Sequence, residues 1–357
     1  MYTMTDALFS RTAVCIAAAV LFAFLLLLSG CTKEEETTTT VLKFEQPSNF
    51  PPLRYRLDNN PITESRFVLG RTLFYDNLLS VNNTISCGSC HQQSVAFAHA
   101  DHRVSHGVFD RLGTRNSPAL QNLGYNTSFM WDGGIFDLDL QPLAPIANHV
   151  EMDEQPTRVV DKLKQSAKYR QLFQNAYGSD EITPAKMLKA LSQFMVMLVS
   201  ANSRYDKLVR NEPGETFSAD ENEGLQLFRG KCQTCHATDL FTDQSFRNNG
   251  LTPTALNDLG RYAVTLNSAD KYRFKVPGLR NIEKTGPFMH DGRFRTLEAV
   301  LDHYSDGVMN SPTLDTALKQ NGGTGIPLSA EEKRKIISFL KTLTDEQFIR
   351  NPIFSEQ

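Results

Sequence analysis

The sequence has little excess charge of either sign and no sustained strand pattern. Its 357 residues carry 37 Lys and Arg against 40 Asp and Glu, a formal net charge of −3. This balance lacks the polycationic signature of nucleic-acid binding and any strong acidic bias, so no nucleic-acid partner is expected. No segment alternates apolar and polar residues over a sustained length, which disfavours a β protein. The length allows two domains with cores of their own.

Long apolar runs are also scarce, and the one that stands out, AVCIAAAVLFAFLLLL, follows Arg11 and ends in LSGC at Cys31. A basic region, a short apolar run and a small-residue cleavage site predict a secretory signal over residues 1–30. LSGC resembles the bacterial lipobox, which implies that Cys31 is lipidated. The alternative is an uncleaved transmembrane anchor, for which the run is short.

With a cleaved signal or with an uncleaved anchor, the folded chain is expected outside the cytoplasm, in the periplasm or at the outer membrane. In the lipoprotein interpretation, an N-terminal lipid is the only membrane attachment. Residues 31–58 begin with the polar stretch TKEEETTTT after Cys31 and are expected to form a flexible tether.

Cysteine is infrequent, and its placement is informative. Besides Cys15 and Cys31 there are two pairs, each followed by histidine, in CGSCH at 87–91 and CQTCH at 232–236. C-x-x-C-H is the attachment signature of c-type haem. One helical turn places two thiols beneath the vinyl groups of the porphyrin, and the adjacent imidazole then points at the iron. The sequence therefore predicts two covalently bound haems, held by the side chains of Cys87, Cys90, Cys232 and Cys235, with His91 and His236 as proximal iron ligands.

Two other uses of these cysteines are possible. Both pairs together have the thiolates for a zinc site, and either pair can form a redox disulfide. Neither alternative explains a histidine directly after each pair.

The remaining pattern is helical. Pro184 begins a run with apolar residues at helical spacing, and its methionines are expected in the core rather than on a metal. Ser218 and Ser329 each precede a glutamate by three residues, which predicts capping boxes. LGRTLFYD and EGLQLFRG, which precede the two haem motifs, suggest an old duplication, and EPGE at 212–215 is a plausible linker. We expect an all-α fold of two cytochrome c-like domains, residues 59–205 and 215–347, with one haem each.

The chain resembles the bacterial di-haem cytochrome c peroxidase and MauG family over nearly the whole mature sequence. The resemblance is carried by SCGSCHQQSVAFA, GTRNSPALQN, FMWDGG, LQPLAPIANHVEM, FKVPGLRN and GPFMHDGRFRTLEAV. It implies an enzyme that reduces hydrogen peroxide to water at the N-terminal haem. Electrons would come from a small external donor, such as a cytochrome c or a cupredoxin, and pass through the C-terminal haem.

The resemblance also assigns roles to individual residues. Trp131 matches a tryptophan that relays electrons between the haems, although a lone tryptophan is more commonly a packed core aromatic. Gln141, Pro145 and Glu151 match residues that line the open face of the N-terminal haem. Glu151 is the expected acid–base group for peroxide cleavage and Gln141 a hydrogen-bonding helper. On local sequence alone, Glu151 would be a solvated acid at a helix start.

A calcium ion between the haems is implied as well. Asn116 and the backbone carbonyls of Thr285 and Pro287 match the family's calcium ligands, and oxygen ligands suit this hard cation.

The sixth ligand of the C-terminal haem follows the HDG motif in this family, as methionine in simpler peroxidases and tyrosine in MauG-like members. The matching position here is Tyr304, with Met309 as the alternative. Met289 and His290 come too early and are expected near the haem edge or the seam between the domains. His303 would point away from the iron if Tyr304 points toward it. An oxygen ligand stabilises higher oxidation states of iron than a thioether does.

Some positions depart from the family pattern. Many relatives cap the resting N-terminal haem with a histidine where this chain has Val108. The same loop carries His99, His102 and His106, so capping by one of them remains open. Two further positions also differ: Gly134 stands where the family usually has arginine, and Phe288 stands where tyrosine is common.

Two other functions compete with peroxide reduction. One is MauG-like oxidation of a side chain on a partner protein, which a tyrosine ligand favours. The other is non-catalytic electron transfer, which is disfavoured because a pure carrier needs both irons capped and gains nothing from Gln141 and Glu151.

Overall fold

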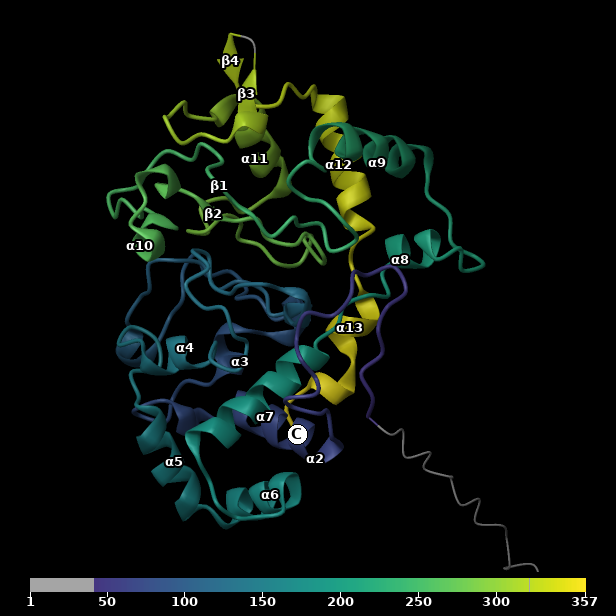
Figure 1. Cartoon of the computed structure of the whole chain (residues 1–357). Coiled ribbons are helices and arrows are strands. Elements are labelled where there is room, and N and C mark those ends of the chain that lie inside the picture. Colours follow the sequence, from purple (N-terminus) through teal and green to yellow (C-terminus); the bar gives the residue numbers. More distant parts are fainter. Residues whose placement is uncertain (1–41, 321) are drawn as a thin grey trace, which may run out of the picture. The chain divides into compact units, whose positions relative to one another are not determined.

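The structure is a computed structural model that describes residues 42–320 and 322–357, which belong to one compact unit, Leu42–Gln357 (Figure 1). The predicted signal, the lipidation at Cys31 and residues 31–41 of the predicted tether lie outside the described residues. Within them, no helix has the length and apolar character needed to cross a membrane. Residues 42–58 do not behave as a tether, because Phe50 is buried against Tyr125 and Leu240. The packed part of the chain therefore begins before the predicted boundary at residue 59.

The described residues are mostly helical, as predicted. The α-helices are α2 (Glu64–Tyr75), α3 (Cys87–Cys90), α4 (Leu143–Ala147), α5 (Pro156–Gln165), α6 (Ala167–Tyr177), α7 (Pro184–Met197), α8 (Arg204–Val209), α9 (Ala219–Lys231), α10 (Tyr262–Thr265), α11 (Leu297–Asp302), α12 (Ala330–Lys341) and α13 (Glu346–Arg350). Single 3₁₀ turns lie at Asn77–Leu79, Gln93–Val95, Val108–Asp110, Leu123–Tyr125, Ser268–Asp270, Thr316–Leu318 and Pro352–Phe354, and a π-helical turn, His303–Gly307, continues α11.

Strands are confined to two short antiparallel pairs in the described residues. β1 (Phe246–Arg247) pairs with β2 (Phe274–Lys275), and β3 (Lys319–Gln320) pairs with β4 (Gly323–Thr324). Each strand has two residues, too few to form the core of a sheet protein.

The predicted helix starts are confirmed. Pro184 is the first residue of α7, and the Thr183 side chain accepts from a backbone N–H in the first turn. Ser218 and Ser329 form reciprocal capping boxes with Glu221 and Glu332 at the starts of α9 and α12.

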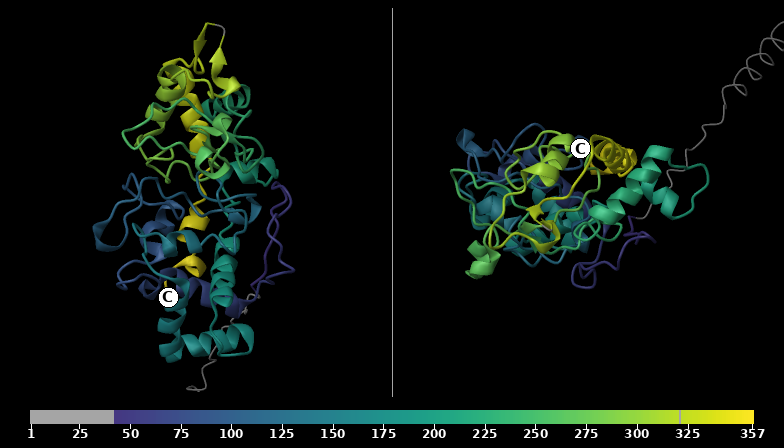
Figure 2. Two further views of the ribbon diagram at one scale, coloured as in Figure 1. Left: turned by 60° about the vertical axis from the view of Figure 1, so that its left-hand side comes forward. Right: turned by 90° about the horizontal axis from the view of Figure 1, so that it is seen from above.

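Two large apolar clusters divide the described residues. The first is built mainly from α2, α5, α6 and α7, with Phe74 and Phe194 in contact at its centre. The second is built from α9, α11 and α12, with Phe228 against Phe339. The C-terminal segment returns to the first half of the chain (Figure 2), where Phe348 and Phe354 belong to the first cluster. Tyr75 donates to the Phe354 carbonyl oxygen over 2.8 Å.

The same close helix contact occurs in both clusters. α2 packs on α7 and α9 packs on α12. At each crossing a glycine faces a backbone carbonyl. A methyl group on Gly70 would lie 2.0 Å from the Ala190 oxygen, and one on Gly224 would lie 2.0 Å from the Lys335 oxygen. Both glycines come from the two similar sequences that precede the haem motifs, so the repeat in sequence coincides with a repeat in packing.

This contact gives a stability prediction with a control in the same helix. Gly224→Ala should lower the free energy of unfolding by about 1–3 kcal/mol, because the methyl group would push α9 away from α12. Gly230→Ala, where a methyl group meets nothing within 4 Å, should instead raise it by up to about 1 kcal/mol through helix propensity. Thermal unfolding of the two holoprotein variants measures both effects. Equal midpoints for the two variants would contradict the packing argument.

Candidate functional site

The two C-x-x-C-H motifs adopt the same local geometry. Cys87–Cys90 forms the single turn of α3, and the His91 N–H donates to the Cys87 carbonyl oxygen over 2.9 Å. The second motif continues from the end of α9, where the His236 N–H donates to the Cys232 carbonyl oxygen over 3.0 Å. Each histidine therefore follows its first cysteine by one helical turn.

Both histidines are oriented by their own backbone surroundings. His91 Nδ1 lies 2.9 Å from the Phe97 carbonyl oxygen, and His236 Nδ1 lies 3.0 Å from that of Phe241. Because a carbonyl oxygen only accepts, each Nδ1 carries the proton and each Nε2 keeps its lone pair. Burial lowers the pKa of both rings, that of His91 to about 4, so both are neutral. A neutral imidazole with an oriented Nε2 suits an iron ligand.

The alternative uses of the cysteines find no support. Burial raises the pKa of the Cys87 and Cys232 thiols to about 12 and that of Cys90 to about 11, whereas redox-active cysteines have lowered pKa values. None of these four cysteines is paired in a disulfide in the part of the chain that the structure describes. In residues 42–320 and 322–357, no three His, Cys, Asp or Glu side chains are grouped to hold one metal ion, so the pairs do not form a four-cysteine zinc site.

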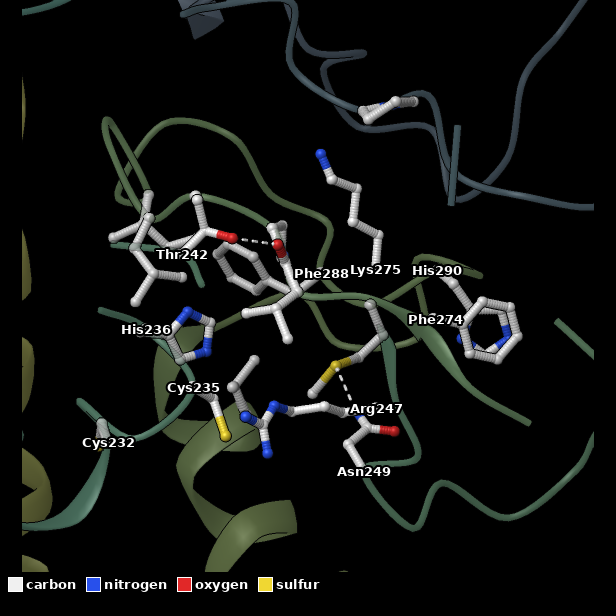
Figure 3. A pocket seen from close by; sticks show the side chains of 18 of the residues that line it. Cys232, Cys235, His236, Thr242, Arg247, Asn249, Phe274, Lys275, Phe288 and His290 are labelled. Carbon is white, nitrogen blue, oxygen red and sulfur yellow. Dashed lines mark hydrogen bonds between the residues drawn. The ribbon is translucent and has the colours of Figure 1, made fainter. Parts of the chain in front are cut away.

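A cavity of about 330 Å³ opens beside the second motif (Figure 3). Cys232, Cys235 and His236 lie on its wall, and apolar side chains of α9, α11 and α12 line much of the rest. The wall continues to Trp131 and Gln141, so the cavity reaches from the second motif toward the first half of the chain. A c-type haem requires two thiols for covalent attachment, one imidazole as iron ligand and apolar surroundings, and this cavity supplies all three.

The surroundings of Lys275 give a further test of whether the cavity suits a haem. Its ammonium group lines the cavity, and its one hydrogen-bond partner among the described residues is the Ser128 carbonyl oxygen at 2.8 Å. Burial lowers its pKa to about 8. The other lysine and arginine side chains on the wall are paired with carboxylates: Lys231 with Glu332, Arg247 with Asp243 and Asp315, and Arg280 with Asp206. A half-buried ammonium without a carboxylate partner suits a ligand that carries its own carboxylates, as haem does through its propionates.

The structure separates the candidates for the sixth ligand. Tyr304 is the second residue of the π-helical turn after α11 and lines the same cavity as His236. Burial raises its pKa to about 12, and a hydrogen bond to Asn249 partly opposes that rise. His303 is turned away, with Nε2 3.0 Å from the Asn249 carbonyl oxygen. Met309 does not line the cavity, and its N–H donates to the Gly250 carbonyl oxygen over 2.8 Å.

Trp131 lies where the two halves of the chain meet. Its Nε1 donates to the Asn116 carbonyl oxygen over 2.8 Å, and its own carbonyl oxygen accepts from the Lys275 N–H over 2.8 Å. It is thereby bonded to a segment near the first motif and to β2 of the second half.

The predicted calcium ligands share one wall. Asn116, Thr285 and Pro287 all line the cavity. The Asn116 Nδ2 donates to the Arg103 carbonyl oxygen over 3.2 Å, which leaves Oδ1 as the side-chain oxygen. The three residues line one cavity, and calcium binding stays a prediction.

Glu151 lies beside the first motif. Its charge is among the influences on the Cys90 thiol, and its carboxylate has no hydrogen-bond or ion-pair partner among the described residues. Pro145, in α4, accepts from the Met152 N–H over 3.2 Å, which fixes the turn that carries Glu151. Gln141 lines the cavity and directs Nε2 toward the Met130 sulfur at 3.8 Å.

The three histidines of the neighbouring loop form a row. His99 is buried and stacks on His102 with ring centroids 4.2 Å apart, and His106 lies 3.3 Å from the Asp110 carboxylate. His99 Nδ1 has no partner among the described residues. Val108 is fully buried, and its N–H donates to the Glu151 carbonyl oxygen over 2.7 Å. Whether one of these histidines caps the first iron stays a prediction.

Two departures from the family pattern have visible surroundings. Beside Gly134, Arg261 donates to the Asp132 carbonyl oxygen over 2.7 Å and lies over the Phe246 ring, so a guanidinium reaches this loop from another segment. Phe288 packs against the second apolar cluster and lines the cavity.

Sequence reasoning did not single out Lys275 or Asn249, which both line the cavity. Lys275 lies in FKVPGLRN, a segment that carries the family resemblance, but the sequence alone does not show that this lysine is buried. Asn249 has no motif of its own, and its position emerges only when β1 is folded beside α11.

The two C-x-x-C-H turns and the cavity agree with what comparison with known proteins shows: the chain belongs to the di-haem cytochrome c peroxidase family. The family described as "Di-haem cytochrome c peroxidase" matches residues 64–214. The methylamine utilization protein MauG of Methylorubrum extorquens is 37% identical over 310 residues, which cover 85% of this chain and 84% of MauG. The cytochrome c551 peroxidase of Nitrosomonas europaea is 35% identical over 286 residues, covering 78% and 80%.

Solved structures agree with this assignment. A MauG-like protein associated with microbial copper homeostasis has 33% identity and a TM-score of 0.78, covering 88% of this chain and 99% of that chain. The di-haem peroxidase BthA of Burkholderia thailandensis, at 20% identity and a TM-score of 0.71, covers 83% and 91% and shows the shared fold alone. The predicted family is confirmed, and the chain is an oxidoreductase that acts on hydrogen peroxide.

Proposed function

We propose that the chain divides its work between two covalently bound haems, one held by His91 in residues 59–205 and one held by His236 in residues 215–347. Each half supplies one C-x-x-C-H turn, one apolar cluster and one glycine-mediated helix crossing. The first site reduces hydrogen peroxide, and the second passes electrons to it. The bound haem supplies the iron at which the O–O bond is cleaved.

The residues around the first haem handle protons. Reduction of H2O2 to two water molecules consumes two electrons and two protons, and one proton must reach the leaving oxygen. Glu151 is suited to move it, because its half-buried carboxylate has no competing partner among the described residues. Gln141, which lines the cavity beside the second motif where that cavity extends toward the first half, is proposed as a neutral N–H donor. Pro145 fixes the turn on which Glu151 stands.

Electrons travel through the seam between the halves. Trp131 is hydrogen-bonded on one side to Asn116 and on the other to Lys275, so its indole has a fixed position on the wall of the cavity beside the second motif. A small cytochrome c or cupredoxin is the proposed donor. Calcium at Asn116, Thr285 and Pro287 would hold the same seam.

The observation that carries this proposal is the asymmetry of the two sites. Tyr304, able to ligate iron, lines the cavity of His236, whereas the acid Glu151 lies beside Cys90. A saturated iron suits electron transfer, and an iron with a proton donor beside it suits peroxide cleavage. Non-catalytic electron transfer gives no use for the carboxylate.

Steady-state consumption of hydrogen peroxide by the holoprotein tests the proposal. With a reduced small cytochrome c, we expect two molecules of cytochrome to be oxidised for each molecule of peroxide. An artificial electron donor is the control for a poorly matched cytochrome. A protein with two haems that consumes no peroxide with either donor would refute the proposal.

MauG-like oxidation of a partner protein is the second candidate, and Tyr304 is the observation that favours it. An oxygen ligand would let the His236 haem store an oxidising equivalent. Slow peroxide turnover with every donor, together with a long-lived oxidised state, would favour this function.

Location outside the cytoplasm and attachment through Cys31 are part of the same proposal. They are supported by the signal pattern of residues 1–30 and by c-type haem attachment, which retains the cofactor in an open compartment.

A further inference from the structure

Two segments of the chain, FMWDGG at 129–134 and FMHDGR at 288–293, fold in the same way. In each, the phenylalanine N–H donates to the carbonyl oxygen six residues further on, over 2.7 Å. In each, the methionine has a left-handed backbone, with φ of +67° at Met130 and +73° at Met289. The glycine three residues later is left-handed as well. The halves therefore repeat one loop, and each loop presents a methionine.

The left-handed backbone of these two methionines costs free energy, so the fold must hold each methionine in place by other contacts. A left-handed conformation is uncommon for residues with a Cβ and costs on the order of 1–3 kcal/mol. In FMHDGR both Met289 and the next residue, His290, line the cavity of His236. His290 is held there by stacking on Phe274, with ring centroids 3.7 Å apart, whereas the Met289 side chain makes no such stack.

Met289 and the predicted sixth ligand, Tyr304, line the same cavity. Asn249 Nδ2 donates to the Met289 sulfur over 3.5 Å, the contact drawn as a dashed line in Figure 3. The same asparagine acts on Tyr304, where it lowers the pKa of the phenol against the rise caused by burial. Met289, Asn249 and Tyr304 all line the cavity that contains His236.

We propose that Met289 is a second axial ligand for the haem iron of His236, taking the sixth position when Tyr304 releases it. The inference rests on the proposed binding of a haem by Cys232, Cys235 and His236. Asn249 is the positioning residue for both ligands. Tyr304 serves the ferric iron and Met289 the ferrous iron.

The two ligands differ in the oxidation state of iron that each one stabilises. A thioether is soft and favours ferrous iron, whereas a phenol oxygen is hard and favours higher oxidation states. The external donor supplies one electron to the iron. The iron–oxygen bond then breaks, an iron–sulfur bond forms, and the phenol oxygen carries a proton taken from solvent. The exchange would raise the reduction potential of this haem and so favour uptake of the electron from the external donor.

The ferric holoprotein of Tyr304→Phe gives the first test. We expect a six-coordinate, low-spin second haem with a sulfur-to-iron charge-transfer band and a midpoint potential more positive than that of the unaltered protein. Tyr304→Phe combined with Met289→Leu should lose the band and become five-coordinate and high-spin. A high-spin second haem in Tyr304→Phe alone, or a sulfur band that survives in the double variant, would overturn the proposal.

The fully reduced protein gives a second test that leaves Tyr304 in place. Proton NMR of the ferrous protein should show the strongly upfield methyl signal of an iron-bound methionine, and Met289→Leu should abolish it. Met130→Leu, the matched change in the repeated loop, should keep it. Absence of the signal in the unaltered protein, or its persistence in Met289→Leu, would contradict the proposal. Fewer than two covalent haems per chain would instead contradict the proposed function.

Discussion

Glu151→Gln is expected to lower the second-order rate constant for the reaction with hydrogen peroxide by about 10²- to 10⁴-fold, the range that a positioned acid–base group contributes. Glutamine preserves the shape of the side chain and removes its ability to take up and release a proton. The half-buried carboxylate beside Cys90 has no partner among the described residues, so the substitution breaks no structural contact. Haem content and the unfolding midpoint should remain unchanged.

Glu154→Gln is the matched control for this change. Glu154 lies three residues away, is buried, and forms an ion pair with Lys162 at 2.8 Å. Its loss should weaken folding, because a lysine loses its partner, and leave the reaction with peroxide unchanged. Stopped-flow mixing of each ferric variant with peroxide measures the rate. If Glu151→Gln reacts as fast as the unaltered protein, Glu151 has no part in cleavage.

Trp131→Phe is the second large effect that we expect. It should reduce turnover with an external donor by at least about tenfold, which corresponds to a rise in the barrier of about 1.4 kcal/mol. Phenylalanine keeps an aromatic ring but loses the easily oxidised indole and the hydrogen bond to the Asn116 carbonyl oxygen. The first reaction with peroxide should be unaffected, because the Glu151 site is unchanged.

Two comparisons distinguish a relay from a structural role for Trp131. Trp131→Tyr, which retains an oxidisable ring, should recover part of the turnover. Rapid freezing after reduction of the second haem should show that electrons accumulate there in Trp131→Phe. Equal turnover for the phenylalanine and unaltered proteins would remove Trp131 from the electron path.

Motifs and caps made much of the fold predictable. The starts of α7, α9 and α12 follow from local chemistry, in which a side-chain oxygen or a proline satisfies the first turn. The helical pattern of residues 184–197 likewise gave the buried methionines of the first cluster. The residue at which the packed unit begins was harder to predict from the sequence. Burial of Phe50 depends on Tyr125 and Leu240, which are distant in sequence.

The sites were predictable to a similar degree. The spacing of C-x-x-C-H gave both motifs, and the family resemblance placed Tyr304 on the cavity of His236. Asn249 and Met289 became candidates only through the fold, since contact between them joins residues forty positions apart. The repeat of FMWDGG and FMHDGR was visible in the sequence, but its left-handed methionines were not.

Electron paramagnetic resonance of the ferric holoprotein, before and after one equivalent of hydrogen peroxide, tests the division of labour most directly. The account predicts equal amounts of one high-spin and one low-spin haem, with loss of the high-spin signal when peroxide is added. Two low-spin signals that peroxide leaves unchanged in every redox state, or a protein without covalent haem, would contradict it.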